Sequence, residues 1–157
     1  MFNHAPKDYK CPICLGVQGI ENSDTMLKQV DLVYKDDFVS VFINSFFIDG
    51  NEGHLIVVPN KHFENLYDLS SEYGHKIIDV SQRMAIAVKK AYGCDGVTIR
   101  QNNEPASGQH AYHYHMHIFP RYDNDKFDEN VSQKRATTLE ERQEYITKIK
   151  QSLQTEI

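Results

Sequence analysis

Three histidines at alternate positions constrain the fold of this chain more than any other feature. His113, His115 and His117 are separated by an aromatic and an apolar residue, and further apolar residues follow. Because successive side chains of a β-strand point to opposite faces, the pattern predicts a strand over 112–119 with all three imidazoles on one face. Alternate Cα atoms of a strand are about 6.6 Å apart, so the three rings are close enough to converge on one small anion or one metal ion.

The length and the net charge of the chain limit the classes of protein to which it can belong. A chain of 157 residues suits one ordinary domain, so we expect a single domain over 1–157 with its core in about 11–122. The net charge of -5 gives no support for nucleic-acid binding, which rests on basic surface. The chain has no apolar run long enough to cross a bilayer, and residues 1–10 lack the apolar core of a secretion signal. We therefore expect a cytoplasmic protein that does not bind membranes.

Runs of β-branched and aromatic residues predict a sheet. They predict strands at 30–34, 38–43, 55–58, 97–101 and 112–119. Only three charged residues separate the first two runs, which suggests a hairpin. Helical segments follow the third and the fifth run, and this order favours an α+β fold with a five-stranded antiparallel sheet and two helices.

Helical periodicity predicts where the two helices lie. In the range 70–92, apolar residues recur at intervals of three, four and seven positions. Ser70 or Ser71 is the expected N-cap, and a glycine lies just past the end. The second helix is expected to follow a capping box that begins at Thr138. The segment 123–136 between strand and helix is charged and sparse in apolar residues, so we expect a surface loop there.

Cys11 and Cys14 are spaced C-x-x-C, and Cys94 stands alone as an expected small buried residue. An odd number of cysteines argues against a disulfide framework and indicates a reducing compartment. The pair has three possible roles: binding one metal, remaining as idle thiols, or redox chemistry. Redox chemistry needs an adjoining helix in a βαβ unit, which the two glycines within 15–21 argue against, so metal binding is favoured.

A polar loop precedes the histidines. Residues 102–109 contain amide side chains and Gly108, so backbone N–H groups there can approach the oxygens of an anion closely. A phosphate-binding loop and an ordinary polar turn both fit this composition.

Several segments together resemble one known family. The chain reads G-H-L-I-V-V-P-N-K-H over 53–62 and H-Y-H-M-H-I-F-P-R over 113–121, with a Gly-Gln pair before the second segment. It resembles the histidine triad (HIT) family, in the branch with an N-terminal C-x-x-C, over about 11–122. The resemblance implies a homodimer with a joined sheet, in which each protomer binds a purine nucleotide substrate. It also implies release of nucleoside monophosphate from phosphoramidates or dinucleoside polyphosphates.

The resemblance also implies roles for particular residues. His115 corresponds to the nucleophile that forms a nucleotidyl-histidine intermediate, which agrees with the nucleophilicity of a neutral imidazole at pH 7. His117 would stabilise the phosphate charge, and Gln109 would contact the leaving group or orient water. The remaining implied residues are Asn44 at the ribose, Asn102 and Gly108 at the phosphate, and His54, which would order the histidine cluster. The family pattern has serine or threonine where this chain has His110, which leaves the preferred leaving group open.

The same branch implies a structural zinc ion. The implied ligands are Cys11, Cys14, His62 and His113, a donor set typical of closed tetrahedral sites. Two alternatives to the enzyme remain. One is a zinc-stabilised nucleotide-binding or scaffolding protein with negligible turnover, and the other is a catalytic metal held by the alternating histidines, as in cupin-like barrels. The second alternative requires more strands and a carboxylate ligand, and is disfavoured.

Overall fold

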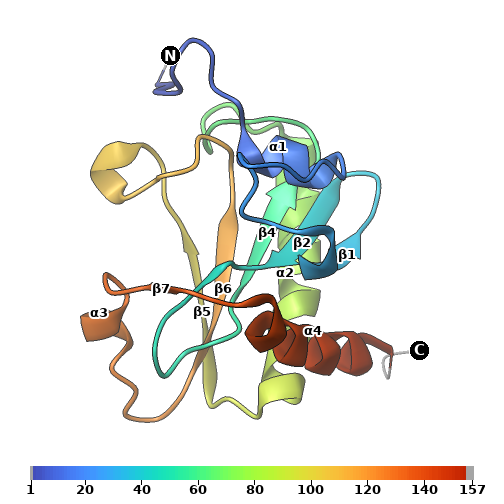
Figure 1. Ribbon diagram of the computed structural model, residues 1–157, viewed down its shortest axis with the longest axis vertical. Coiled ribbons are helices and arrows are strands. Elements are labelled where there is room, and N and C mark those ends of the chain that lie inside the picture. The colour runs from blue at the N-terminus through green and yellow to red at the C-terminus, as the bar shows by residue number, and fades with distance from the viewer. Residues whose placement is uncertain (1, 155–157) are drawn as a thin grey trace.

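The computed structural model describes residues 2–154 and is built around a five-stranded antiparallel sheet (Figure 1). The strand order is β1-β2-β4-β6-β5. The strands are β1 (Leu32–Lys35), β2 (Val39–Ile43), β4 (Leu55–Pro59), β5 (Gly96–Gln101) and β6 (Met116–Arg121). The α+β class, the five strands and the antiparallel pairing are therefore confirmed.

The histidine strand is shorter than the spacing predicted. β6 begins at Met116, so only His117 of the three histidines lies in a strand, and the prediction of one strand face carrying all three was wrong. The ladder between β4 and β6 ends where Val57 pairs with Met116. Before that point the chain turns away, because the amide of Tyr114 donates to the carbonyl of Phe63 and the ring of His113 turns toward Pro59.

The two long helices cover one face of the sheet. α2 (Ser71–Tyr92) begins after the N-cap Ser70 and ends at Gly93, which adopts the left-handed φ of 63°. α4 (Leu139–Gln154) begins with the predicted capping box: the amide of Thr138 donates to Glu141 Oε2 at 2.9 Å, and the amide of Glu141 donates to Thr138 Oγ1 at 3.2 Å. α2 packs on β2, β4, β5 and β6, α4 packs on α2, β1 and β2, and together they form the main hydrophobic core.

Two short helices were not predicted. α1 (Pro12–Val17) includes part of the segment whose glycines argued against a helix. Pro12 occupies the first turn and the Cys11 thiol accepts the amide of Cys14, so the helix is capped at the cysteine pair itself. α1 lies on the opposite face of the sheet from α2 (Figure 1). Its apolar residues pack against Phe42 and Ile56.

The segment 123–136 is more ordered than the predicted surface loop. It contains α3 (Phe127–Asn130) and β7 (Arg135–Ala136), and β7 pairs with β3 (Phe46–Phe47) in a second, two-stranded sheet. In Figure 1 this segment crosses in front of the main sheet on its way to α4. A short 3-10 helix η1 (Gln29–Asp31) likewise replaces the start of the strand predicted over 30–34.

A buried ion pair joins α4 to η1. Arg142 Nε donates to Asp31 Oδ1 at 2.7 Å and Nη2 to Asp31 Oδ2 at 3.2 Å, and the two residues are 4% and 0% exposed.

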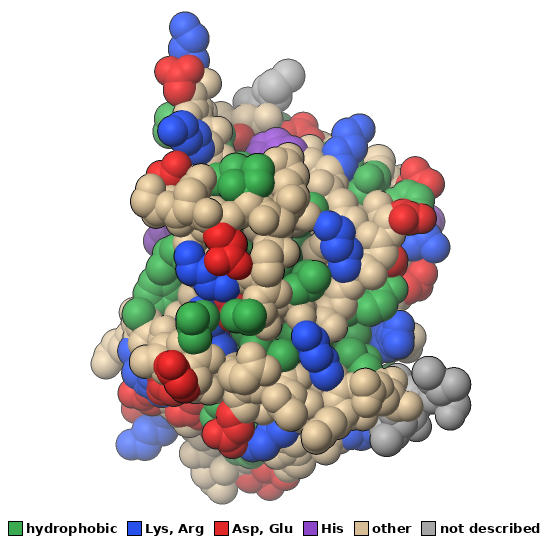
Figure 2. Space-filling view, turned by 45° about the vertical axis from the view of Figure 1, so that its right-hand side comes forward, with side chains coloured by type: hydrophobic (Ala, Val, Ile, Leu, Met, Phe, Trp, Pro, Cys, Tyr) green, Lys and Arg blue, Asp and Glu red, His purple; other side chains and the backbone are tan. Residues whose placement is uncertain are grey.

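The surface carries mixed charges, and Figure 2 shows basic and acidic side chains intermixed on the face it draws. Within residues 2–154, no helix combines the length and apolar character that a membrane span requires.

Candidate functional site

A cavity of about 790 Å³ opens on the sheet face that does not carry α2. Its walls come from β4, β5 and β6, from the loop that follows β5, from α1 and from the segment 131–134. The predicted site residues that line it are Asn44, His54, Asn102, Gly108, His115 and His117. His117 faces it because it lies opposite Ile56 in the β4–β6 ladder and shares the face of that residue.

Within residues 2–154, only one ring nitrogen of His115 has a hydrogen-bond partner. Its Nδ1 lies 2.7 Å from the carbonyl oxygen of His113, and only a protonated Nδ1 can donate to that oxygen. Burial lowers the pKa of His115, so the ring is neutral at pH 7. Nε2 therefore carries the lone pair, and His115 has the tautomer of a nucleophile.

His54 and His117 lie side by side as a tilted pair of rings next to His115. Their ring centroids lie 5.4 Å apart, His117 lies 5.0 Å from His115, and both rings pack on Phe119. Burial lowers the pKa of His54 to about 3 and that of His117 well below its ordinary value, so both rings are neutral at pH 7. Nδ1 of each ring is buried and has no hydrogen-bond partner within the described residues. Such atoms are costly unless a ligand or water satisfies them, which supports a polar ligand in this cavity.

The structure places Gln109 outside the cavity. Its side-chain oxygen accepts the amide of Glu104 at 2.7 Å, and its nitrogen donates to the carbonyls of Glu64 and Ala111 at 2.6 and 3.1 Å. The carboxamide therefore braces the loop that carries Gly108, and it does not reach the site of a leaving group in this conformation. His110, by contrast, is exposed and lines the cavity.

The loop that follows β5 adopts a conformation that depends on glycine. Gly108 has a φ of +89°, and a Cβ there would lie 3.3 Å from Asn102 Nδ2. Asn102 Oδ1 accepts the Nε–H of Arg100 at 2.9 Å, and Asn44 Oδ1 accepts the amide of Phe46 at 2.8 Å. Both asparagines therefore present their amide groups at the cavity wall from fixed positions.

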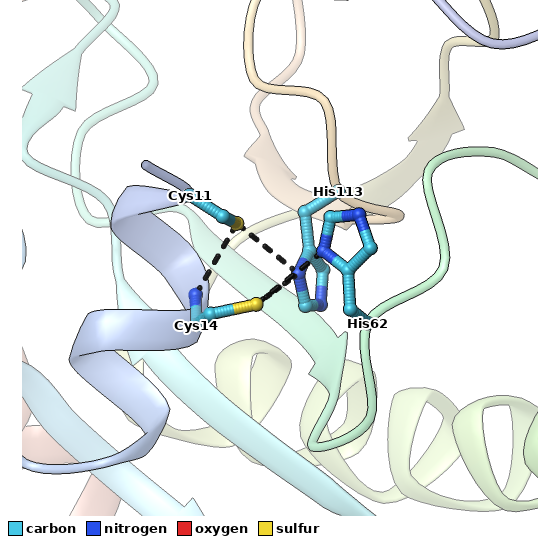
Figure 3. Close-up of side chains that lie close together, drawn as sticks. All are labelled: Cys11, Cys14, His62 and His113. Atoms are coloured by element: carbon cyan, nitrogen blue, oxygen red, sulfur yellow. Dashed lines mark hydrogen bonds between the residues drawn. The ribbon is translucent and has the colours of Figure 1, made fainter. Parts of the chain in front are cut away.

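Cys11, Cys14, His62 and His113 come together at the N-terminus of α1 (Figure 3). Their potential ligand atoms all lie within 4.8 Å of one another, and three sulfur-to-Nδ1 distances are 3.3 to 3.4 Å. A tetrahedral zinc ion at ordinary bond lengths needs sulfur and nitrogen about 3.6 Å apart, so the cluster is compatible with a metal site.

One further contact suits the cluster for a metal ion. His113 Nε2 lies 3.0 Å from the carbonyl oxygen of Pro59, which places the proton on Nε2 and directs Nδ1 toward the sulfurs. Hydrogen bonding from Cys14 lowers the pKa of the Cys11 thiol, and the same interaction raises the pKa of Cys14. The structure thus divides the alternating histidines between two sites, because His113 faces the cysteines while His115 and His117 face the cavity.

Sequence reasoning missed two cations at the cavity. Arg100 lies opposite His117 in the β5–β6 ladder, and Lys134 lies in the segment that was predicted to be a loop. No local signal marks either residue, because each reaches the cavity only through long-range pairing.

Comparison with known proteins places the chain in a family. The HIT domain model matches residues 27–124. A HIT-like protein of Saccharolobus solfataricus is 36% identical over 94 residues, which are 60% of this chain and 66% of that protein, just under two thirds of its length. The adenylylsulfatase HINT3 of Arabidopsis thaliana is 27% identical over 93 residues, 59% of this chain and 46% of that protein.

One solved structure that shares the fold holds zinc. The zinc-bound histidine triad family protein from Mycobacterium smegmatis superposes with a TM-score of 0.76 at 25% identity, and the match covers 93% of this chain and 94% of that one. The family model covers more than half of the chain and includes the cavity histidines. The chain therefore belongs to the HIT family.

Proposed function

We propose that this protein hydrolyses nucleotides by transferring a nucleoside monophosphate first to His115 and then to water. The observation that carries the proposal is the free Nε2 of His115, held in a cavity beside two buried ring nitrogens that have no partner among the described residues. The similarity to an adenylylsulfatase supports a substrate with an activated phosphate at the nucleoside.

Two balanced steps follow from this arrangement. His115 Nε2 forms a bond to the α-phosphorus while the bond to the leaving atom breaks, and the leaving group departs with that electron pair and takes a proton from water. The imidazole is then cationic, and its Nδ1–H bond to the His113 carbonyl stabilises the charge. A water oxygen next bonds to phosphorus, the P–N bond returns its electron pair to Nε2, and a proton passes to solvent.

The neighbouring residues act on the phosphate and the nucleoside. We assign contact with the phosphate oxygens to His117, Asn102 and the backbone at Gly108, and contact with the ribose to Asn44. The ring of His54 packs against both His117 and Phe119, and we assign to it the role of orienting His117. Gln109 acts through the loop that it braces, as a positioning residue.

The metal cluster has a structural role in this proposal. Cys11, Cys14, His62 and His113 would hold zinc, which fixes α1 against the segment that leads to His115. Four protein ligands would complete the coordination of zinc, so the ion would serve structure and would leave no position for substrate. The carbonyl of His113 then presents the hydrogen-bond acceptor that orients His115.

We also propose a homodimer that joins two sheets at β5. Among the described strands β5 pairs only with β6, so its other edge is open, and Ile99 on this strand is 50% exposed. Sedimentation of the protein at several concentrations tests this proposal. A monomer at all concentrations contradicts it.

Adduct mapping tests the catalytic proposal. The protein is mixed with adenosine 5′-phosphoramidate or with diadenosine tetraphosphate, quenched at short times, and mapped by mass spectrometry for added AMP. We expect the adduct on His115, its loss in His115→Asn, and its retention in the control His75→Asn, which changes an exposed histidine on α2. An adduct on another residue contradicts the assignment of the nucleophile.

One observation favours the nucleotide-binding alternative. The side-chain amide of Gln109, which the family pattern places at the leaving group, is bonded to the backbone of Glu64, Glu104 and Ala111 and does not line the cavity. If both substrates bind but give neither adduct nor AMP, the protein is a nucleotide-binding module. His115→Asn would then leave affinity and background turnover unchanged.

A further inference from the structure

The cavity is bordered by cations that the histidine chemistry does not use. Among its lining residues Lys10, Arg100 and Lys134 are basic, and only Asp24 is acidic. Lys10 Nζ lies 3.8 Å from Asp24 Oδ2, so these two charges offset one another. Within residues 2–154 no ion pair joins Arg100 or Lys134 to a carboxylate. Two uncompensated positive charges therefore remain at the cavity wall.

Arg100 is fixed beside the histidines by the sheet. It lies directly opposite His117 in the β5–β6 ladder, and its Nε donates to Asn102 Oδ1 at 2.9 Å. Since Asn102 belongs to the loop that carries Gly108, the guanidinium is tied to the wall that we assign to the phosphate.

Lys134 approaches from a different part of the chain, the segment 131–137, which we call the strap. β7 pairs the strap with β3, and the amide of Thr137 donates to the carbonyl of Ser45 at 3.1 Å. Arg135 forms ion pairs of 3.0 Å with Asp49 and 2.8 Å with Glu141. These contacts hold the strap directly after Lys134, whose Nζ lies 5.5 Å from the centre of the Phe46 ring.

The charge of Lys134 acts electrostatically on two histidines of the cavity. Burial is the main reason that the pKa values of His54 and His117 are low, and repulsion from Lys134 adds to the lowering for both rings. An ammonium group that acts on these two rings also acts on an anion bound between them. The HIT domain model ends at residue 124, so the strap lies beyond the matched region.

We propose that Lys134, assisted by Arg100, is a specificity-determining residue that selects leaving groups with several negative charges, such as a nucleoside polyphosphate, over an uncharged amine. The inference rests on the proposed function and names the substrate class for the same site. When the bond from the α-phosphorus to the bridging oxygen breaks, the electron pair stays on the leaving polyphosphate. Two fixed cations stabilise that charge, whereas an amine leaving group gains nothing from them.

The test compares two substrates that share the AMP half. Diadenosine tetraphosphate releases a polyphosphate, and adenosine 5′-phosphoramidate releases ammonia. We expect Lys134→Met to lower kcat/KM about tenfold for the tetraphosphate and less than twofold for the phosphoramidate, with Lys134→Arg restoring most of the loss. Lys150→Met is the matched control, because it removes an exposed lysine of α4 that does not line the cavity. Equal losses on both substrates, or none on either, overturn the proposal.

A binding measurement separates this proposal from the proposed function. ATP and adenosine are titrated calorimetrically into the intact protein and into Lys134→Met, and neither titration depends on turnover. A selective loss of about tenfold in ATP affinity supports the role of Lys134 even if no adduct forms at His115. An unchanged preference for ATP over adenosine refutes that role even if the adduct forms.

Discussion

Removing Arg142 should destabilise the protein more than any change to a surface charge. Its guanidinium is the two-point partner of Asp31, which is fully buried, and it also donates to the carbonyl of Thr137 at 3.0 Å. In Arg142→Met the side chain keeps much of its apolar contact, but Asp31 keeps only the backbone amide of Lys28 at 2.8 Å. The variant therefore isolates the effect of a buried carboxylate that has lost its cation.

The expected loss follows from that burial. Removing one member of a buried, hydrogen-bonded ion pair costs about 3 to 5 kcal/mol, because the remaining charge stays desolvated. Asp31 retains one donor, so we expect the lower end, about 3 kcal/mol, which is a large part of the total stability of an ordinary domain. The double variant Asp31→Asn, Arg142→Met removes the orphaned charge and should recover at least about 1 kcal/mol of the loss.

Urea denaturation followed by circular dichroism measures these differences. The control is Lys148→Met, which removes an exposed pair with Glu144 on the same helix and should leave the midpoint almost unchanged. A loss below about 1 kcal/mol for Arg142→Met would show that water reaches Asp31 and would refute the reasoning. The same conclusion would follow if the double variant were no more stable than Arg142→Met.

Three further predictions concern the site and the core beneath it. Gly53→Ala should cost about 2 kcal/mol or more in urea denaturation, because Gly53 has a φ of +81° and an added Cβ would overlap the Tyr145 ring. Lowering the pH from 7 to 5 should cost about 2 kcal/mol through His54, since its pKa is about 3 when folded and about 6.5 when unfolded, so only the unfolded chain gains the proton. His54→Gln should reduce this dependence of stability on pH, and an unchanged dependence would show that another group causes it. Cys11→Ser should lower the zinc content measured by mass spectrometry and the melting temperature together, and chelation should lower the melting temperature only of the unsubstituted protein.

The parts of the fold that were predictable are those with a local physical cause. The helical period of its apolar residues predicts α2. Ser70 marks its start, and Gly93 marks its end because glycine adopts the left-handed conformation that other residues resist. The strands of β2 and β4 follow from runs of buried β-branched residues. In each case the sequence that causes the structure lies within a few residues of it.

The segment around the histidines shows where local reasoning stops. The alternation of the histidines predicts a strand, but the strand begins only at Met116, where pairing with β4 begins. Nothing within a few residues of His113 reveals that its ring turns to the carbonyl of Pro59 and to thiols about a hundred positions earlier in the chain. The resemblance to a family supplied that ligand set, whereas periodicity alone would have left all three rings in one site.

The strap depends on long-range contacts even more strongly. Its composition is that of a solvated loop, and its place at the cavity results from pairing with β3 and from the anchoring of α4 through Arg142 and Asp31, 111 positions apart. Because the strap leads directly into α4, the same ion pair that stabilises the fold also keeps Lys134 at the cavity. A condition that loosens α4 without altering the histidines should therefore reduce the discrimination between charged and uncharged leaving groups before it abolishes the adduct at His115. Mild urea provides this condition, and equal loss of both activities across the titration would show that the strap and the histidine site unfold as one unit.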